Sequence, residues 1–306
     1  MATEGERVWT PGRPVDLRAA LGPLRRGAGD PTCRIVDGAV WRTARTPTGA
    51  GTQRLTVDAA AGTVVCRAWG PGAGWLLDTL PVLLGAQDTT ADEFDPRHPL
   101  VRRTWRSHRG WRVPRTGLVL EALVPAVLEQ KVTGLEAWRS WRALLRRYGT
   151  PAPGPAPDGM AVAPTAAEWA GIPSWEWHRL GVGPERSRTL VGVARRAAAV
   201  ERTLALPPAA VEAALRSLPG VGAWTAAEVR QRAHGDPDAV SVGDAHLAAE
   251  VVYALTGARD GDDARLLELL APDTGHRYRV VRMVELSGSR RPRRGPRYAP
   301  LDHRAR

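Results

Sequence analysis

The sequence predicts an N-terminal α+β unit with an antiparallel sheet, followed by a mostly α-helical domain. Two early segments, 32–46 and 52–70, each contain two β-rich runs joined by a Gly-containing turn, the pattern of a β-hairpin. From about residue 116 onward, nearly every segment has apolar residues at helical spacing. A stretch rich in Pro and Gly, 149–164, interrupts these helices and is expected to be a loop.

The expected elements follow the chain in order. A short amphipathic helix over 14–27 precedes the hairpins, and a second helix over 74–85 follows them. We expect the N-terminal α+β unit to span 1–105 and the helical domain, with two lobes and a cleft, to span 106–290. The Arg- and Pro-rich end, 291–306, is expected to be a basic tail. The helices expected in the helical domain cover 117–130, 136–148, 184–202, 208–218, 224–234, 245–255, 262–270 and 276–286.

The charge balance favours a polyanionic partner. The chain has 43 Lys and Arg against 32 Asp and Glu, a formal charge of +11, and Lys131 is its only lysine. Such a surplus points most often to nucleic acid as the partner, although a GC-rich genome, which favours arginine codons, would also produce it. No signal peptide or membrane-spanning run is evident. Two cysteines, Cys33 and Cys66, are too few for a four-thiolate cluster, and both are expected to be reduced, as in a cytoplasmic protein. We also expect the protein to be nucleoid-associated and monomeric.

A glycine-rich turn between two expected helices is the most informative motif. In LPGVGAWTA (218–226), Pro219 ends one helix and a new helix begins near Ala223. Gly220 and Gly222 permit close or left-handed backbone, and the amides at the start of the second helix can bind an anion. A DNA phosphate fits such a site, and binding through backbone alone is independent of base sequence. Glycine is also common in ordinary helix–helix turns, so the motif alone leaves both interpretations open.

Asp244 is the candidate catalytic residue. It follows Gly243 and precedes the helical pattern of 245–255, where an Asp commonly caps the helix. The helix dipole also favours an anion there. An ionised carboxylate that faces a cleft suits a reaction through an oxocarbenium-like sugar. The two interpretations are compatible, because one residue can cap the helix and still direct an oxygen at a substrate.

Three stretches together resemble the helix-hairpin-helix DNA glycosylases, and within them the alkylated-base branch, DNA-3-methyladenine glycosylase II. They are LPGVGAWTAAEV (218–229), DPDAVSVGDAHL (236–247) and LEALVPAVLEQKVTG (120–134). The resemblance covers roughly 115–290, and the N-terminal unit matches by the order of its elements. It implies a helix-hairpin-helix glycosylase domain in this part of the chain. Double-stranded DNA with alkylated bases is the implied partner.

The resemblance also assigns roles to residues of this sequence. It implies that Asp244 is the catalytic aspartate, and that Gln130 or Lys131 enters the base stack beside the extruded nucleotide. It implies no cofactor and no catalytic metal, although backbone carbonyls of the hairpin can hold a structural monovalent cation. The residues implied to bind DNA through the hairpin are Leu218, Gly220, Val221, Gly222 and Thr225, and the carbonyls are those of Leu218 and Val221.

Trp224 bears on the type of reaction. Members of this superfamily that also cut the strand carry a lysine at the corresponding position, which attacks the sugar and forms a Schiff base. Tryptophan cannot make that bond, so the sequence predicts a monofunctional enzyme with water as the nucleophile. Purines alkylated at ring nitrogens are cationic and leave easily, and an indole face attracts a cation by up to about 2 kcal/mol when desolvated.

Several further residues are candidates for the base pocket. Trp175 and Trp177 could line it, as could Tyr278, and ordinary packing between helices is the alternative for all three. Glu228 lies one turn after Trp224 on the same helix face, where better-known members of the family are expected to carry an aromatic residue.

Two other functions stay open at this stage. The hairpin could belong to a non-catalytic DNA-binding protein that senses distorted duplex. The enzyme could instead be an oxidised-base glycosylase, although lyase chemistry would lack its lysine at position 224.

Overall fold

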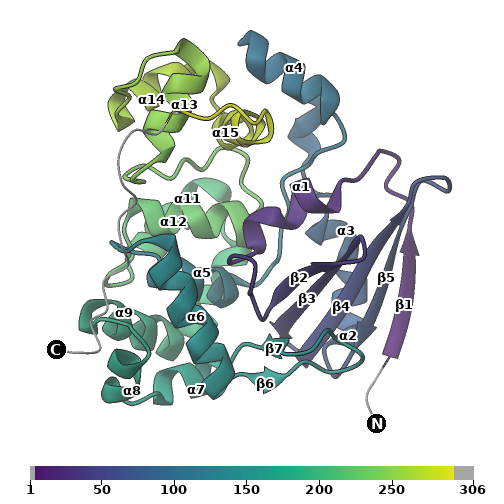
Figure 1. The fold of residues 1–306 in the computed structure, drawn as a ribbon, viewed down its shortest axis with the longest axis vertical. Helices are drawn as coiled ribbons and strands as arrows, with labels where there is room; N and C mark the ends of the chain where they lie inside the picture. The colour runs from purple at the N-terminus through teal and green to yellow at the C-terminus, as the bar shows by residue number, and fades with distance from the viewer. Residues whose placement is uncertain (1–3, 293–306) are drawn as a thin grey trace.

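The computed structural model describes residues 4–292, in which an antiparallel sheet lies beside a body of helices (Figure 1). The sheet comes from the N-terminal part of the chain and the helical body from the rest, so the predicted fold class is confirmed. From residue 293 on, the expected basic tail lies outside the described residues. No helix in the described range is long and apolar enough to cross a membrane.

The sheet has five strands in the order β1-β5-β4-β3-β2. Both predicted hairpins are present. Asp37 and Gly38 adopt φ values of 49° and 77° between β2 and β3, as a tight primed turn requires. The edge strand β1 was not expected, and it pairs with β5, about 60 residues later in the chain. The strands are β1 (Glu4–Trp9), β2 (Cys33–Val36), β3 (Ala39–Thr46), β4 (Gly49–Asp58) and β5 (Thr63–Trp69).

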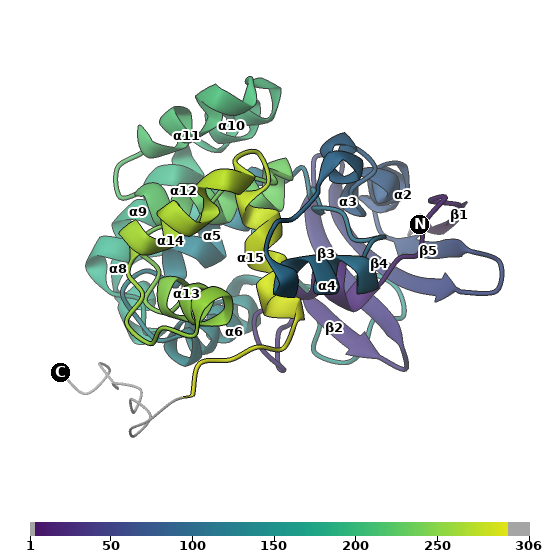
Figure 2. The same cartoon turned by 90° about the horizontal axis from the view of Figure 1, so that it is seen from above.

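Three short helices cover one face of the sheet: α1 (Leu17–Leu21), α2 (Ala73–Asp78) and α3 (Leu80–Leu83). Figure 2 shows the sheet and its helices on one side and the helical body on the other. Leu21, Leu55 and Leu80 form the centre of this small core, each at most 1% exposed. Cys33 and Cys66 lie in the same core as free thiols, and burial raises the pKa of each to about 12.

The helical body follows the predicted pattern with four differences. The segment expected as one helix over 184–202 divides into two, and the segment 224–234 ends in a π-helical turn, Arg230–His234. Three helices, α4, α7 and α8, were not expected. The ends of the expected loop 149–164 pair as the strands β6 (Thr150–Pro151) and β7 (Ala161–Val162). The helices are α4 (Pro99–Ser107), α5 (Val119–Leu128), α6 (Gly134–Tyr148), α7 (Ala166–Gly171), α8 (Ser174–Arg179), α9 (Pro184–Arg195), α10 (Ala197–Glu201), α11 (Pro208–Arg216), α12 (Ala223–Val229), α13 (Leu247–Thr256), α14 (Asp263–Leu270) and α15 (Arg277–Leu286).

Two hydrophobic cores hold the helical body together. The first surrounds the apolar helix α5 and extends over α6 to α12. The second joins α13, α14 and α15 to the segment 91–113, which contributes Phe94, Trp105 and Trp111. The hairpin between α11 and α12 belongs to the first core, and the helix that follows Asp244 belongs to the second. The candidate site therefore lies where the two cores meet.

Candidate functional site

The hairpin between α11 and α12 is shaped by its first glycine. Gly220 has φ +83°, and a Cβ atom there would lie 2.0 Å from the Oγ1 of Thr189 on α9. Only glycine combines this left-handed conformation with so close an approach. The Val221 amide donates to the Leu218 carbonyl at 3.0 Å and closes the turn.

Gly222 has a different role from Gly220. It is the N-cap residue of α12, with extended backbone (φ −91°, ψ −176°) and open space where a Cβ would be. No side chain caps the helix there. The first amides of a helix have no acceptor within the helix, so the start of α12 presents bare backbone donors at the surface, as the anion-site interpretation expects.

A groove of about 970 Å³ runs along the hairpin. One wall is the loop between α5 and α6, and another is the start of α9. Trp224 and Gly243, the residue before Asp244, also line it. The groove therefore brings together the three stretches that were singled out in the sequence.

Gln130 and Lys131 occupy different positions in the α5–α6 loop. The Gln130 amide donates to the Gly220 carbonyl at 2.9 Å and to the Thr225 hydroxyl at 2.8 Å, which ties it to the hairpin. Lys131 is exposed and adopts a left-handed conformation with φ 54°, uncommon for a residue other than glycine. Of the two candidates for insertion into DNA, Lys131 is the one without a hydrogen bond to the hairpin.

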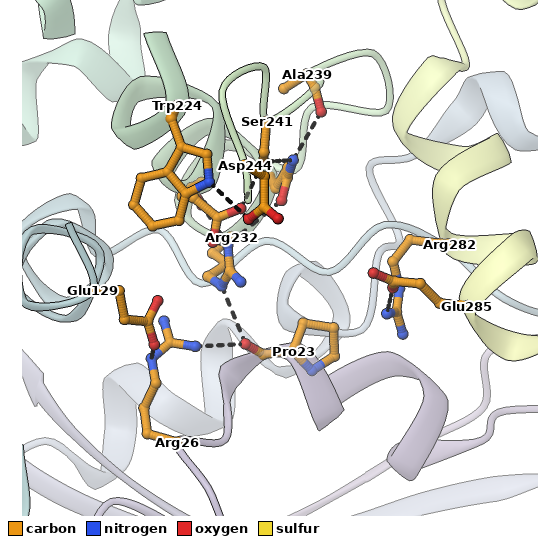
Figure 3. Close-up of polar contacts among 12 residues, drawn as sticks. Pro23, Arg26, Glu129, Trp224, Arg232, Ala239, Ser241, Asp244, Arg282 and Glu285 are labelled. Atoms are coloured by element: carbon orange, nitrogen blue, oxygen red, sulfur yellow. Dashed lines mark hydrogen bonds and ion pairs between the residues drawn. The ribbon is translucent and has the colours of Figure 1, made fainter. Parts of the chain in front are cut away.

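Trp224 and Asp244 are in direct contact (Figure 3). The indole Nε1 donates to Asp244 Oδ2 at 3.1 Å. Asp244 Oδ1 accepts from the amides of His246 and Leu247 at 2.8 and 2.9 Å, so the carboxylate holds the backbone where α13 begins, although the N-cap residue itself is His246. Three donors thus hold the half-buried Asp244 side chain in one orientation beside the groove.

A polar network lies next to Asp244. The Ser241 hydroxyl donates to Glu228 Oε1 at 2.6 Å and accepts from Gln231 Nε2 at 2.9 Å. Glu228 Oε2 forms an ion pair with Arg232 at 2.8 Å. Both carboxylate oxygens of Glu228, a candidate for the base pocket, thus already have polar partners within the protein.

Arg232 connects this network to the N-terminal unit. Its Nε donates to the carbonyl of Pro23 at 3.1 Å, and Arg26 donates to the same carbonyl at 2.9 Å. Burial acts to lower the pKa of Arg232, but the nearby Glu228, Tyr278 and Glu129 outweigh it, so the pKa is raised. The guanidinium therefore stays charged at the boundary between the two units.

The remaining aromatic candidates lie in different environments. Tyr278 is 4% exposed, contacts the edge of Trp111, and has its pKa raised to about 12 by burial, so it is a residue of the second core and does not line the groove. Trp177 is 1% exposed and stacks on Trp169 at 5.8 Å, so assigning it to the base pocket was wrong: it is a core residue. Trp175 is 69% exposed and, like Trp177, does not line the groove.

Sequence reasoning missed Ser241 and Arg232. The four-residue spacing from Glu228 to Arg232 was a usable signal, because oppositely charged side chains at that spacing meet on a helix. Ser241 lies within the stretch quoted for the resemblance, and nothing in the sequence distinguishes it as a partner of Glu228.

No family model and no curated protein sequence matches the chain. Solved structures do match it. The 3-methyladenine DNA-glycosylase from Archaeoglobus fulgidus superposes with a TM-score of 0.73 at 14% identity, covering 92% of this chain and 98% of that one. The fold is that of solved DNA glycosylases.

A second solved protein shares this fold. The 8-oxoguanine glycosylase/lyase of Clostridium acetobutylicum in its apo form gives a TM-score of 0.69 at 11% identity, covering 94% of this chain and 98% of that one. Its complex with double-stranded DNA containing cytosine opposite 8-oxoG gives 0.68 at 11% identity, over 94% and 97% of the two chains. At these identities the likeness concerns the fold, and it spans both the sheet and the helical body.

Proposed function

We propose that this protein is a monofunctional DNA glycosylase that hydrolyses the N-glycosidic bond of alkylated purines in duplex DNA and leaves an abasic site. The observation that carries the proposal is the contact between Trp224 and Asp244 at the edge of the hairpin groove. It joins a flat, electron-rich ring to a carboxylate beside a surface suited to phosphate. The shared fold with solved DNA glycosylases supports it.

The hairpin would bind the DNA backbone. A Cβ at Gly222 would meet open space, so a phosphate has room to approach the first amides of α12 closely. Lys131 stands exposed across the same groove, and we assign it the place left by the extruded nucleotide. Extruding the nucleotide costs a few kcal/mol and less at a weakly paired lesion.

The carbonyls of the hairpin would suit the implied monovalent cation. The Leu218 carbonyl accepts one hydrogen bond, from Val221, and a carbonyl oxygen has two lone pairs. Neutral carbonyl oxygens suit a monovalent cation. Held by the Leu218 and Val221 carbonyls, such an ion would add positive charge next to the phosphate site.

Asp244 would act on the sugar, and Trp224 on the base. As the glycosidic bond lengthens, positive charge develops on the sugar, and a fixed carboxylate stabilises it. An indole face favours a cationic base over a neutral one. Because position 224 is tryptophan and the only lysine is Lys131, water is the proposed nucleophile.

The test is base release from methylated DNA by the wild-type protein and Asp244→Asn. The wild type should release 3-methyladenine and 7-methylguanine, measured by chromatography. The variant should bind the same DNA with unchanged affinity and release neither base. Equal release by both proteins would refute the catalytic role, and no release by either would favour a non-catalytic DNA-binding protein.

The oxidised-base alternative is supported by the fold shared with the Clostridium 8-oxoguanine glycosylase/lyase. An oligonucleotide with 8-oxoguanine opposite cytosine belongs in the same assay, with borohydride added to trap any Schiff base. Release of 8-oxoguanine would change the proposed substrate class from alkylated purines to oxidised bases. A trapped adduct would overturn the monofunctional mechanism.

A further inference from the structure

We propose that Glu228 is a positioning residue for Asp244, that it acts through Ser241, and that Arg232 anchors it to the N-terminal unit. This inference rests on the proposed function, because it assigns Glu228 a part in base release. It gives the pocket candidate a role other than contact with the base.

Ser241 joins the network to the catalytic loop. Its hydroxyl is held by Glu228 and Gln231, while its carbonyl accepts from the Asp244 amide at 3.2 Å. Ser241 is 4% exposed, so water does not readily replace these partners. The side chain of Ser241 therefore fixes the backbone that carries Asp244.

Arg232 extends the connection across the molecule. From Glu228 it reaches the Pro23 carbonyl, which Arg26 also contacts, and the Nε of Arg26 lies 3.6 Å from Glu129 (Figure 3). Glu129 directly precedes Gln130, which holds the hairpin carbonyl of Gly220. Hydrogen bonds, two ion pairs and the peptide bond from Glu129 to Gln130 thus connect the loop that carries Asp244, by way of the N-terminal unit, to the loop between α5 and α6.

This arrangement predicts a selective defect. Asp244 keeps its own contacts to the amides of α13 when Glu228 is changed, and the hairpin amides are untouched, so DNA binding should persist. The loop 239–244 would lose one of its two side-chain partners, and Gln231 would remain as the other. Displacement of a catalytic group by about 1 Å can cost about 100-fold in rate.

The experiment measures single-turnover base release and DNA affinity separately for Glu228→Gln, Ser241→Ala and the double variant. Each single variant should release base about 10- to 100-fold more slowly, with a dissociation constant within about twofold of wild type. Because Glu228 acts through Ser241, the double variant should be no slower than the slower single variant.

Glu212→Gln is the matched control. Glu212 pairs with Arg230 at 2.6 Å, and Arg230 also pairs with Asp236 at 2.7 Å, so this change removes one of the two acidic partners of an arginine on the same helical stretch, away from Ser241. It should release base at the wild-type rate. Melting temperatures of all variants identify any that fail to fold. If Glu228→Gln fails to fold, Ser241→Ala, which leaves no unpaired charge, still tests the inference.

The outcomes separate this inference from the proposed function. If the wild type releases no base, the proposed function fails. If the wild type is active and Ser241→Ala matches it, the positioning role is wrong. Additive losses in the double variant, or a rate loss matched by an equal loss of DNA affinity, would also overturn it.

Discussion

Gly220→Ala is the change for which the structure gives the most specific expectation. Alanine at φ +83° costs about 1–2 kcal/mol relative to glycine. Its Cβ would also lie 2.0 Å from Thr189 Oγ1 and 2.9 Å from Thr189 Cγ2, so α9 or the hairpin must move. Overpacking of this kind typically costs about 1–3 kcal/mol. We therefore expect Gly220→Ala to lower the free energy of unfolding by about 2–5 kcal/mol.

Two companion variants divide this cost into its parts. Gly222→Ala lies two residues away, in extended backbone with open space around the new Cβ, and should change stability by less than about 0.5 kcal/mol. Adding Thr189→Ala to Gly220→Ala removes both of the closest contacts, after which the next, Thr189 Cβ, lies at 3.0 Å. The double variant should regain the overpacking part and retain the backbone part.

Urea unfolding of the four proteins provides the measurement, followed by DNA binding for those that remain folded. Gly222→Ala should weaken binding to every DNA sequence alike, although it leaves stability intact, because its Cβ enters the space that a phosphate would occupy. The reasoning fails if Gly220→Ala is as stable as Gly222→Ala, or if Thr189→Ala recovers nothing.

Three further predictions concern other parts of the molecule. The side chains of Arg279 and Asp88 are 0% and 2% exposed and form an ion pair at 2.7 and 2.8 Å. Arg279→Met leaves the buried carboxylate unpaired and should lower the free energy of unfolding, measured in urea, by about 3–5 kcal/mol. Adding Asp88→Leu should restore much of this loss. Burial lowers the pKa of His234 from 6.5 to about 4, so between these pH values the unfolded chain binds a proton that the folded chain does not. The free energy of unfolding should therefore fall as the pH drops from about 6.5 to about 4. His234→Gln should flatten that part of a pH–stability curve. Trp224→Phe keeps an aromatic ring but removes the hydrogen bond to Asp244. Single-turnover assays should show base release slowed about tenfold, with little change in DNA affinity. An unchanged rate would show that an aromatic ring without this hydrogen bond is enough for base release.

The elements that the sequence predicted well are those specified by local chemistry. The hairpin at Asp37 and Gly38 follows from two residues that tolerate positive φ between β-rich runs. The strand β1 has no such local signal, because its partner β5 is supplied by a distant part of the chain. The short helices α7 and α8 offer too few turns for a helical period to stand out.

The same distinction applies to the candidate site. The turn between α11 and α12 and the place of Asp244 before α13 could be predicted because each is encoded within a dozen residues, whereas their roles stay predictions. Trp177 was misassigned because periodicity does not show whether a helix face meets a cleft or a core. The bond from Arg232 to Pro23 joins residues 209 positions apart, and only the assembled fold brings them together.

The hydrogen bond between Trp224 and Asp244 constrains both partners in a way that suits the proposed reaction. Because Nε1 lies in the plane of the indole, the bond directs the edge of the ring at the carboxylate, while the ring packs against the first core and lines the groove. Asp244 Oδ1 already accepts two amide hydrogen bonds, whereas Oδ2 accepts only the indole N–H within the described residues. Oδ2 is therefore the oxygen with capacity left for a developing positive charge, and it lies next to the ring that would hold the departing base. A lysine at position 224 would supply an amine in place of this fixed edge, so in the proposed reaction tryptophan would tie the selection of the base and the orientation of the carboxylate to one side chain.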